Sequence, residues 1–234
     1  MDNSRILIIP DLHLPYAHCD SFDFLEKVKK IMQPSSIICL GDELDFHSYS
    51  FHSPDPDLDS AGKELSKAIA QISYLKEVFP EVAMCESNHG SMVYRKQKFN
   101  GTPRHLLKSY NEVLGVDDKW KWFPSITVVF KNGRKCKFVH QAGANILAAS
   151  QSHGCSLVSG HLHSQFEVRY WDSGNGINFG AVAGCLIDNE SLAFAYNKLF
   201  SKKPILGCMF IENGLPSLIP MTTDSNNRWS GTKI

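Results

Sequence analysis

Five short polar clusters in this sequence each follow a short apolar run, and their side chains have metal-ligand chemistry. Together they supply two carboxylates, one amide oxygen and five imidazoles. Mixed oxygen and nitrogen ligation suits first-row divalent metals, whereas an all-oxygen set would suit Mg²⁺ or Ca²⁺. The clusters are Asp11-Leu12-His13, Gly41-Asp42, Asn88-His89, His140-Gln141 and Gly160-His161-Leu162-His163.

The spacing within the clusters indicates how the side chains could share one site. On an extended chain, residues i and i+2 point the same way, so Asp11 and His13 can face one ligand, as can His161 and His163. Gly41 allows a tight turn that can bring Asp42 into a crowded position. A carboxylate bridging two metals about 3.5–4 Å apart is typical of two-metal hydrolases.

The first half of the chain predicts elements that would carry these clusters to a common edge. Apolar runs indicate buried strands, and apolar residues at helical spacing indicate amphipathic helices. The expected strands cover 5–10, 36–40 and 82–85, and the expected helices cover 21–32 and 59–79. This alternation is typical of a layered α/β fold, in which ligands bind at the carboxyl ends of the strands.

The second half is richer in strands. Asn132-Gly133 predicts a hairpin between strands at 126–130 and 136–139. A helix is expected at 142–152, and further strands are expected at 156–159, 166–171, 177–179 and 205–211. No linker or repeat interrupts the chain, so we expect one domain over 1–234, with a polar, mobile tail at 224–234.

The ordered motifs D-x-H, G-D, N-H, H and G-H-x-H resemble those of the calcineurin-like metallophosphoesterases, over residues 6 to about 211. The similarity extends to the small, cap-less members common in bacteriophage genomes, which share the patterns at 10–15, 41–46 and 183–186. The resemblance implies a layered α/β/β/α sandwich of mixed sheets. It also implies hydrolysis of phosphate esters by metal-activated water.

The resemblance also implies roles for individual residues. Two divalent ions are expected, Mn²⁺ first and Mg²⁺, Fe, Zn²⁺, Co²⁺ or Ni²⁺ as alternatives, with Asp42 bridging them and His89 as a catalytic imidazole that is not a ligand. The first ion would be bound by Asp11, His13 and His163, and the second by Asn88, His140 and His161.

One position departs from the family pattern. The family usually has an acidic residue after the motif histidine, where this chain has Gly90. Asp45 and Glu86 are candidates to orient His89 in its place, and metal-bound histidines need such partners.

Three residues are candidate substrate contacts. Asp45 is one, Tyr16 could stack on a base or simply cover the core, and Arg95 could clamp phosphate or belong to a solvated helix face.

Composition narrows the function classes. Hydrophobic residues make up 43% and charged residues 21%, which excludes a disordered chain, a collagen and a coiled coil. The net charge of zero argues against a general nucleic-acid coat, although it allows a local basic patch. The sequence has seven scattered cysteines, and it has neither an apolar run long enough to span a membrane nor a signal-peptide core. These features predict a cytoplasmic protein that does not use a membrane. If the protein is phage-encoded, the compartment would be the host cytoplasm.

Several functions remain open at this stage. A phosphomonoesterase acting on small nucleotides such as (deoxy)nucleoside 5′-monophosphates leads, with a small phosphorylated molecule as partner. A DNA nuclease or a cyclic-nucleotide phosphodiesterase would use the same site, and DNA is the less favoured partner because of the neutral charge. A binding protein with a silent site is the remote alternative. The sequence is compatible with a homodimer but does not fix the oligomeric state.

Overall fold

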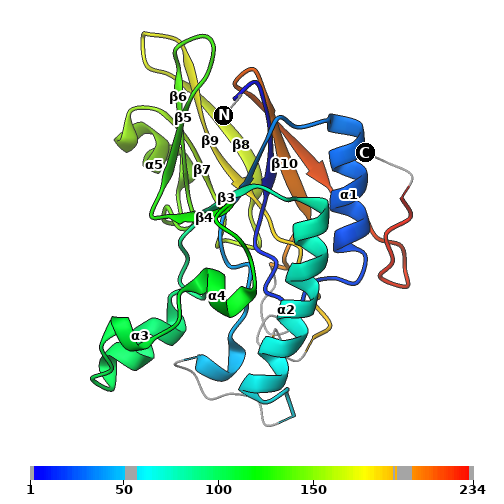
Figure 1. The fold of residues 1–234 in the computed structure, drawn as a ribbon. Helices are drawn as coiled ribbons and strands as arrows, with labels where there is room; N and C mark the ends of the chain where they lie inside the picture. The colour runs from blue at the N-terminus through cyan, green and yellow to red at the C-terminus, as the bar shows by residue number, and fades with distance from the viewer. Residues whose placement is uncertain (1–2, 51–56, 192, 194–201, 232–234) are drawn as a thin grey trace.

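A computed structural model describes residues 3–50, 57–191, 193 and 202–231, which form two mixed β-sheets and flanking helices (Figure 1). The first sheet has the order β11-β10-β1-β2-β3-β4. Strands β1 to β4 run parallel, and β10 joins them antiparallel to β1. Its strands are β1 (Arg5–Ile9), β2 (Ser36–Cys39), β3 (Val82–Cys85), β4 (Trp120–Phe123), β10 (Gly207–Glu212) and β11 (Leu215–Pro220).

The second sheet has the order β5-β6-β7-β9-β8. Strands β6, β7 and β9 are parallel, and β5 and β8 flank them as antiparallel edge strands. Its strands are β5 (Ile126–Val129), β6 (Lys135–Val139), β7 (Ser156–Ser159), β8 (Phe166–Asp172) and β9 (Ile177–Ala183).

The two sheets pack face to face and are covered by helices on their outer faces. One buried apolar cluster lies between the two sheets. It combines residues of β1 and β2 in the first sheet, such as Ile8 and Ile38, with residues of β6, β7 and β9 in the second, such as Phe138 and Val158. Helices α1 (Ser21–Met32) and α2 (Ala61–Val78) cover the first sheet, and α5 (Ile146–His153) covers the second. The predicted α/β/β/α sandwich is confirmed.

Shorter helices lie in the connections between strands of the first sheet. They are α3 (Met92–Phe99), α4 (Tyr110–Leu114), η1 (His47–Tyr49) and η2 (Arg104–Leu106). A capping box at Ser109 and Glu112 begins α4. The segment from α3 to α4 links β3 to β4 and begins shortly after the Asn88-His89 cluster.

Two strands and two boundaries differ from the predictions. One of the boundaries is the end of β9, which was expected at 179 and lies at Ala183. The sequence analysis missed β4 and β11, which are the two edge strands of the first sheet. The helix expected at 142–152 begins only at Ile146, because the side chain of Asn145 accepts a hydrogen bond from the amide of Ala148 and caps it there.

Residues 223–229, which include the first part of the tail expected to be mobile at 224–234, contact α1 and the residue before it. The mobility of that tail stays a prediction. Arg228 pairs with the Asp20 carboxylate through two nitrogen atoms, at 2.6 and 2.9 Å. The Trp229 ring packs edge-on against Phe24 of α1, with ring centroids 5.4 Å apart. Residues 223–229 therefore form a strap across α1, while 232–234 lie outside the described residues.

Two further observations concern membrane-spanning helices and the state of the cysteines. Among the described helices, none is both long enough and apolar enough to cross a membrane. All seven cysteines are free thiols, and burial raises the pKa of the Cys39, Cys136 and Cys208 side chains. The single-domain organisation stays a prediction.

Candidate metal centre

Asp42 lies at the centre of the polar clusters. The chain turns sharply after β2, with left-handed φ angles of 98° at Gly41 and 48° at Asp42. A Cβ atom at Gly41 would lie 2.8 Å from the Cys85 carbonyl oxygen, so only glycine fits there. The turn buries the Asp42 carboxylate, whose Oδ2 lies 3.1 Å from His140 Nε2 and 3.5 Å from His13 Nε2. The carboxylate therefore faces an imidazole on either side.

Asp11 follows β1 and is fully buried. Its Oδ2 accepts a hydrogen bond from the His161 amide at 2.8 Å and lies 3.1 Å from His163 Nε2. Its Oδ1 is buried with no hydrogen-bond partner. Such an orphaned carboxylate oxygen is costly unless a cation satisfies it, so Asp11 fits a metal ligand.

His140 follows β6 and approaches Asp42 from the second sheet. Its Nδ1 donates to the Leu40 carbonyl at 3.0 Å, which directs Nε2 toward Asp42 and toward Asn88 Oδ1, 2.6 Å away. This backbone partner fixes the ring orientation that metal-bound histidines require. The His161 ring packs edge-on against His140, with centroids 5.2 Å apart.

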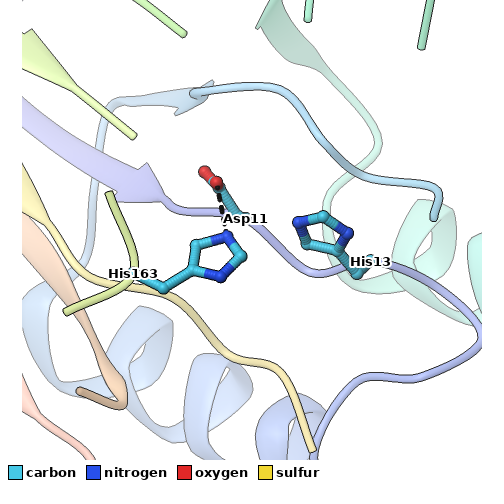
Figure 2. Close-up of side chains that lie close together, drawn as sticks. All are labelled: Asp11, His13 and His163. Atoms are coloured by element: carbon cyan, nitrogen blue, oxygen red, sulfur yellow. Dashed lines mark hydrogen bonds and ion pairs between the residues drawn. The ribbon is translucent and has the colours of Figure 1, made fainter. Parts of the chain in front are cut away.

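The clusters thus converge into two sets of donor atoms that meet near Asp42. Asp11, His13 and His163 form one set, shown in Figure 2, and Asp42, His140 and His161 form the other. The donor atoms within each set lie within 4.8 Å of one another. Carboxylate and imidazole donors at this spacing suit a divalent metal site. All seven predicted ligands lie in this region, although their binding to metal stays a prediction.

The backbone at this centre is unusual. His13, Asp42 and His161 have φ angles of 51°, 48° and 67°, in the left-handed region that side chains seldom adopt. Such conformations cost free energy and cluster at functional sites. The positions of these three side chains are therefore maintained against a local backbone preference.

The charges of the centre are strongly coupled. Burial opposes ionisation of Asp42, but the hydrogen bond and charge of His140, with His13 and His89, hold the pKa of that carboxyl well below its usual range. Burial also disfavours a charged His140, yet Asp11 and Asp42 raise the pKa of its imidazole to about 9. A proton on His140 thus partly balances the buried carboxylates, a task that a divalent cation would take over.

His89 differs from the other histidines of the centre in its partners. Its amide donates to Asp42 Oδ1 at 3.1 Å, and its Nδ1 bonds the carbonyl of Asp45. The ring packs edge-on against His13, with centroids 4.5 Å apart, and is 24% exposed. His89 also groups with His13 and Asp42 as a third candidate metal set. Its role as a catalytic imidazole that is not a ligand stays a prediction.

Asp45 is placed to orient histidines, which is one of the two roles expected for it. Its other expected role, contact with a substrate, stays a prediction. Its carboxylate is buried, with Oδ1 2.7 Å from His13 Nδ1 and 3.7 Å from His89 Nδ1. His47 Nδ1 lies 4.0 Å from Oδ2. Glu86 is exposed, so Asp45 is the acidic neighbour of His89 that Gly90 does not provide.

The other two candidate substrate contacts have different surroundings. Arg95 is exposed and donates to the Asn88 carbonyl at 2.8 Å, so its guanidinium lies at the rim of the centre. Tyr16 packs in an apolar cluster with Cys185 and Ile187, and its hydroxyl is buried. This agrees with the alternative that Tyr16 covers the core.

The sequence analysis missed a buried polar group next to Asp42, which consists of Glu43, Tyr110 and Trp122. Glu43 is buried and accepts a hydrogen bond from Trp122 Nε1 at 3.0 Å. Burial raises the pKa of the Glu43 carboxyl and, with the nearby charge of Glu43, that of the Tyr110 hydroxyl. Glu43 stands in the G-D-x-x-D segment, but Tyr110 and Trp122 lie far along the chain and carry no motif signal.

Comparisons with known proteins place the fold. No protein-family model matches the sequence, and no curated protein matches it in a sequence search. Among solved structures, the chain is similar to Yfce, a phosphoesterase from E. coli, with a TM-score of 0.50 at 15% identity over 92% of both chains. It is also similar to Vps29 from Chaetomium thermophilum, with a TM-score of 0.50 at 14% identity, over 95% of this chain and 88% of that one.

A nuclease, MPE from Pseudomonas putida, aligns less closely, with a TM-score of 0.40 at 11% identity over 92% of this chain and 85% of that one. This likeness is too distant to bear on function. The likeness to Yfce and Vps29 shows the fold, which is that of the calcineurin-like phosphoesterases.

Proposed function

We propose that the protein is a metal-dependent phosphoesterase with two divalent ions bound at the converging clusters. The observation that supports this most directly is the Asp42 carboxylate, which lies between the His13 side and the His140 side of the centre. The orphaned Asp11 oxygen and the left-handed ligand residues point the same way.

The residues divide the work of hydrolysis between them. When bound, the two ions lower the pKa of a water and neutralise phosphoryl oxygens. Asp42 holds its position from the turn after β2, and His140 is fixed by the Leu40 carbonyl. His89 donates a proton to the leaving alkoxide, with its ring orientation set by the Asp45 carbonyl.

The proposed substrate is the phosphate monoester of a nucleotide. Arg95 at the rim supports it, because a guanidinium can pair with phosphate through two nitrogen atoms. Manganese is the proposed native metal, and the mixed donor set is compatible with it. The bacteriophage relationship and the cytoplasmic location are part of the same proposal and rest on the motifs and the free cysteines.

A substrate panel tests this proposal. Nucleoside 5′-monophosphates, cyclic nucleotides, bis(p-nitrophenyl) phosphate and DNA would be assayed with Mn²⁺, and the same panel would be repeated after exhaustive chelation. We expect metal-dependent release of inorganic phosphate from the monophosphates. Turnover of diesters alone would favour the nuclease or phosphodiesterase alternative, and activity that survives chelation would contradict the metal-dependent mechanism.

A further inference from the structure

The neutral net charge of the chain conceals a separation of charge. Residues 87–111 contain five of the 24 Lys and Arg residues and none of the 24 Asp and Glu residues. The rest of the chain therefore carries 19 basic residues against 24 acidic ones. The five basic residues are Arg95, Lys96, Lys98, Arg104 and Lys108.

Four of these side chains lie on α3 and η2, and Lys108 lies in the loop after η2. We name the segment of residues 91–108 the basic arm. Figure 1 shows α3 reaching away from the two sheets. Arg95, Lys98, Arg104 and Lys108 are exposed. Neither Lys98 nor Arg104 forms an ion pair with an Asp or Glu in the part of the chain that the structure describes. Their positive charge is therefore directed to solvent.

The basic arm also exposes groups that can stack on planar ligands. The Phe99 ring is 88% exposed and can stack on such a ligand, and the aliphatic Leu106 side chain is 67% exposed. The Arg104 guanidinium lies over the Tyr94 ring, 5.2 Å from its centroid. Aromatic rings and guanidinium planes between positive charges are typical of surfaces that bind single-stranded nucleic acid.

The basic arm begins at the metal centre. Helix α3 starts at Met92, directly after the Asn88-His89 cluster, and Arg95 donates to the Asn88 carbonyl at 2.8 Å. A polyanion that lies along α3 would therefore have one end beside His89. The remaining acidic part of the molecule would repel the same polyanion, which favours this one path.

We propose that the basic arm binds single-stranded nucleic acid and brings the phosphate at the end of the strand to the metal centre. This rests on the proposed phosphoesterase function and extends its substrate from free nucleotides to nucleotides at a strand end.

Two other anionic partners fit the basic arm less well. An anionic membrane would require a continuous apolar helix face, but Met92 is buried and Val93 is half-buried, so α3 offers only Phe99 and its neighbours. A duplex hides its bases in the stack, where an exposed ring such as Phe99 cannot reach them. Exposed stacking groups thus favour a single strand.

Fluorescence anisotropy with a labelled oligonucleotide tests this inference on the full chain. Binding of a single strand of about 12 nucleotides, within the usual footprint of such surfaces, would be measured in EDTA so that hydrolysis does not interfere. The test variants are Lys98→Gln with Arg104→Gln, and Phe99→Ala. The matched control is Lys131→Gln with Lys135→Gln, which removes two exposed charges from the β5–β6 hairpin.

We expect the double arm variant to lower the slope of log affinity against log salt by about 1.4, or 0.7 for each lost phosphate contact. Phe99→Ala should weaken binding at least about fivefold, and the hairpin variant should bind like the wild type. Equal losses in the arm and hairpin variants, no binding by the wild type at low salt, or tighter binding to duplex DNA or phosphatidylserine vesicles would each overturn the inference.

The same preparations separate this inference from the proposed function. Hydrolysis of p-nitrophenyl phosphate with Mn²⁺ reports the metal centre without any strand. If wild-type protein binds the oligonucleotide but does not hydrolyse this ester, the proposed function fails and the strand-binding surface stands. If it hydrolyses the ester but does not bind the oligonucleotide, the basic arm has no such role.

Discussion

Asp42 offers the sharpest test at the level of single residues, because its carboxylate faces both halves of the centre. Asp42→Asn keeps the shape but removes the charge, so we expect loss of bound metal and loss of nearly all activity. Asp118→Asn, at an exposed position, is the control and should behave like the wild type. Retention of more than about a tenth of the rate at saturating Mn²⁺, a difference below about 1.4 kcal/mol, would show that Asp42 does not bridge.

His89 should be revealed by its dependence on the leaving group. As a general acid, His89→Ala should lower turnover of a nucleoside monophosphate roughly 10²–10⁴-fold. It should affect p-nitrophenyl phosphate much less, because nitrophenolate leaves without a proton. Metal content, measured by mass spectrometry of the purified variant, should stay at the wild-type level.

The exposed His105→Ala is the matched control for this variant. Equal losses on both substrates would mean that His89 only positions phosphate. Loss of metal would instead make His89 a ligand, in the set that it forms with His13 and Asp42.

Side-chain motifs were enough to predict which residues gather at the centre, but not how they are held. Asp11, Asp42 and His140 carry their signals in residue type and spacing. The carbonyls of Leu40 and Asp45, which orient His140 and His89, are backbone atoms present in every residue. The buried Asp45 carboxylate shows the same limit, because its sequence position did not distinguish an orienting role from a substrate contact.

At the level of elements, the chain directly after β7 of the second sheet lies very close to Asp11, which follows β1 of the first sheet. A Cβ atom at Gly160 would lie 2.2 Å from Asp11 Oδ1. Gly160→Ala should therefore displace either Asp11 or the following His161, and lower metal affinity at least about tenfold. Titration of the metal-free protein with Mn²⁺ measures this.

Gly62→Ala is the matched control, because its added methyl group meets nothing within 4 Å and lies in helix α2. It should leave metal affinity unchanged and stabilise the fold by up to about 1 kcal/mol. Unchanged metal affinity in Gly160→Ala would show that Asp11 does not need this close approach.

The strap of residues 223–229 predicts a specific acid sensitivity. The hydrogen bond from Arg228 lowers the pKa of Asp20 to about 2. The ionised form of Asp20 therefore stabilises the folded state above its usual pKa, and this contribution is lost as the pH falls from about 4 to about 2. Since Arg228 is 64% exposed, solvent screens this pair, and we expect its contribution to stability to be small.

Urea unfolding of Asp20→Asn, Arg228→Gln and the double variant measures the pair. The double variant should lose little more than either single variant at pH 7, and Asp20→Asn should match the wild type near pH 2. Additive losses would mean that the two side chains act independently.

The elements themselves were predictable where one pattern dominated. Helix α1 ends at Met32, as expected from its apolar face and the following Pro34. Strand β11 was missed because Pro216 and Pro220 argue against a strand, yet both lie in an edge strand, where proline is tolerated. The strap was missed because a polar composition gives no sign of the partners, Asp20 and Phe24, that lie about 200 residues earlier in the chain.

For the whole molecule, the centre joins the two sheets. Asp11 follows β1 of the first sheet, and the His161 amide that donates to it lies in the loop after β7 of the second sheet. Ions bound by both should therefore stabilise the native state as a unit. We expect the thermal midpoint to rise progressively with Mn²⁺ concentration. At a hundred times the dissociation constant, the free energy of unfolding should increase by about 2.7 kcal/mol.

Asp42→Asn is the control for that measurement and should show a much smaller shift. A wild-type midpoint that is independent of Mn²⁺ would contradict metal binding at this junction, whatever the substrate proves to be.

The left-handed backbone at His13, Asp42 and His161 has an evolutionary consequence. Glycine at each of these positions would relieve the backbone strain, at a gain of order 1 kcal/mol in folding free energy. Selection for stability alone would thus replace these donors one position at a time, and selection for the proposed ions would oppose that loss. On this proposal the sequence is a compromise, in which the most stable chain for this backbone would be the one least able to bind the proposed ions.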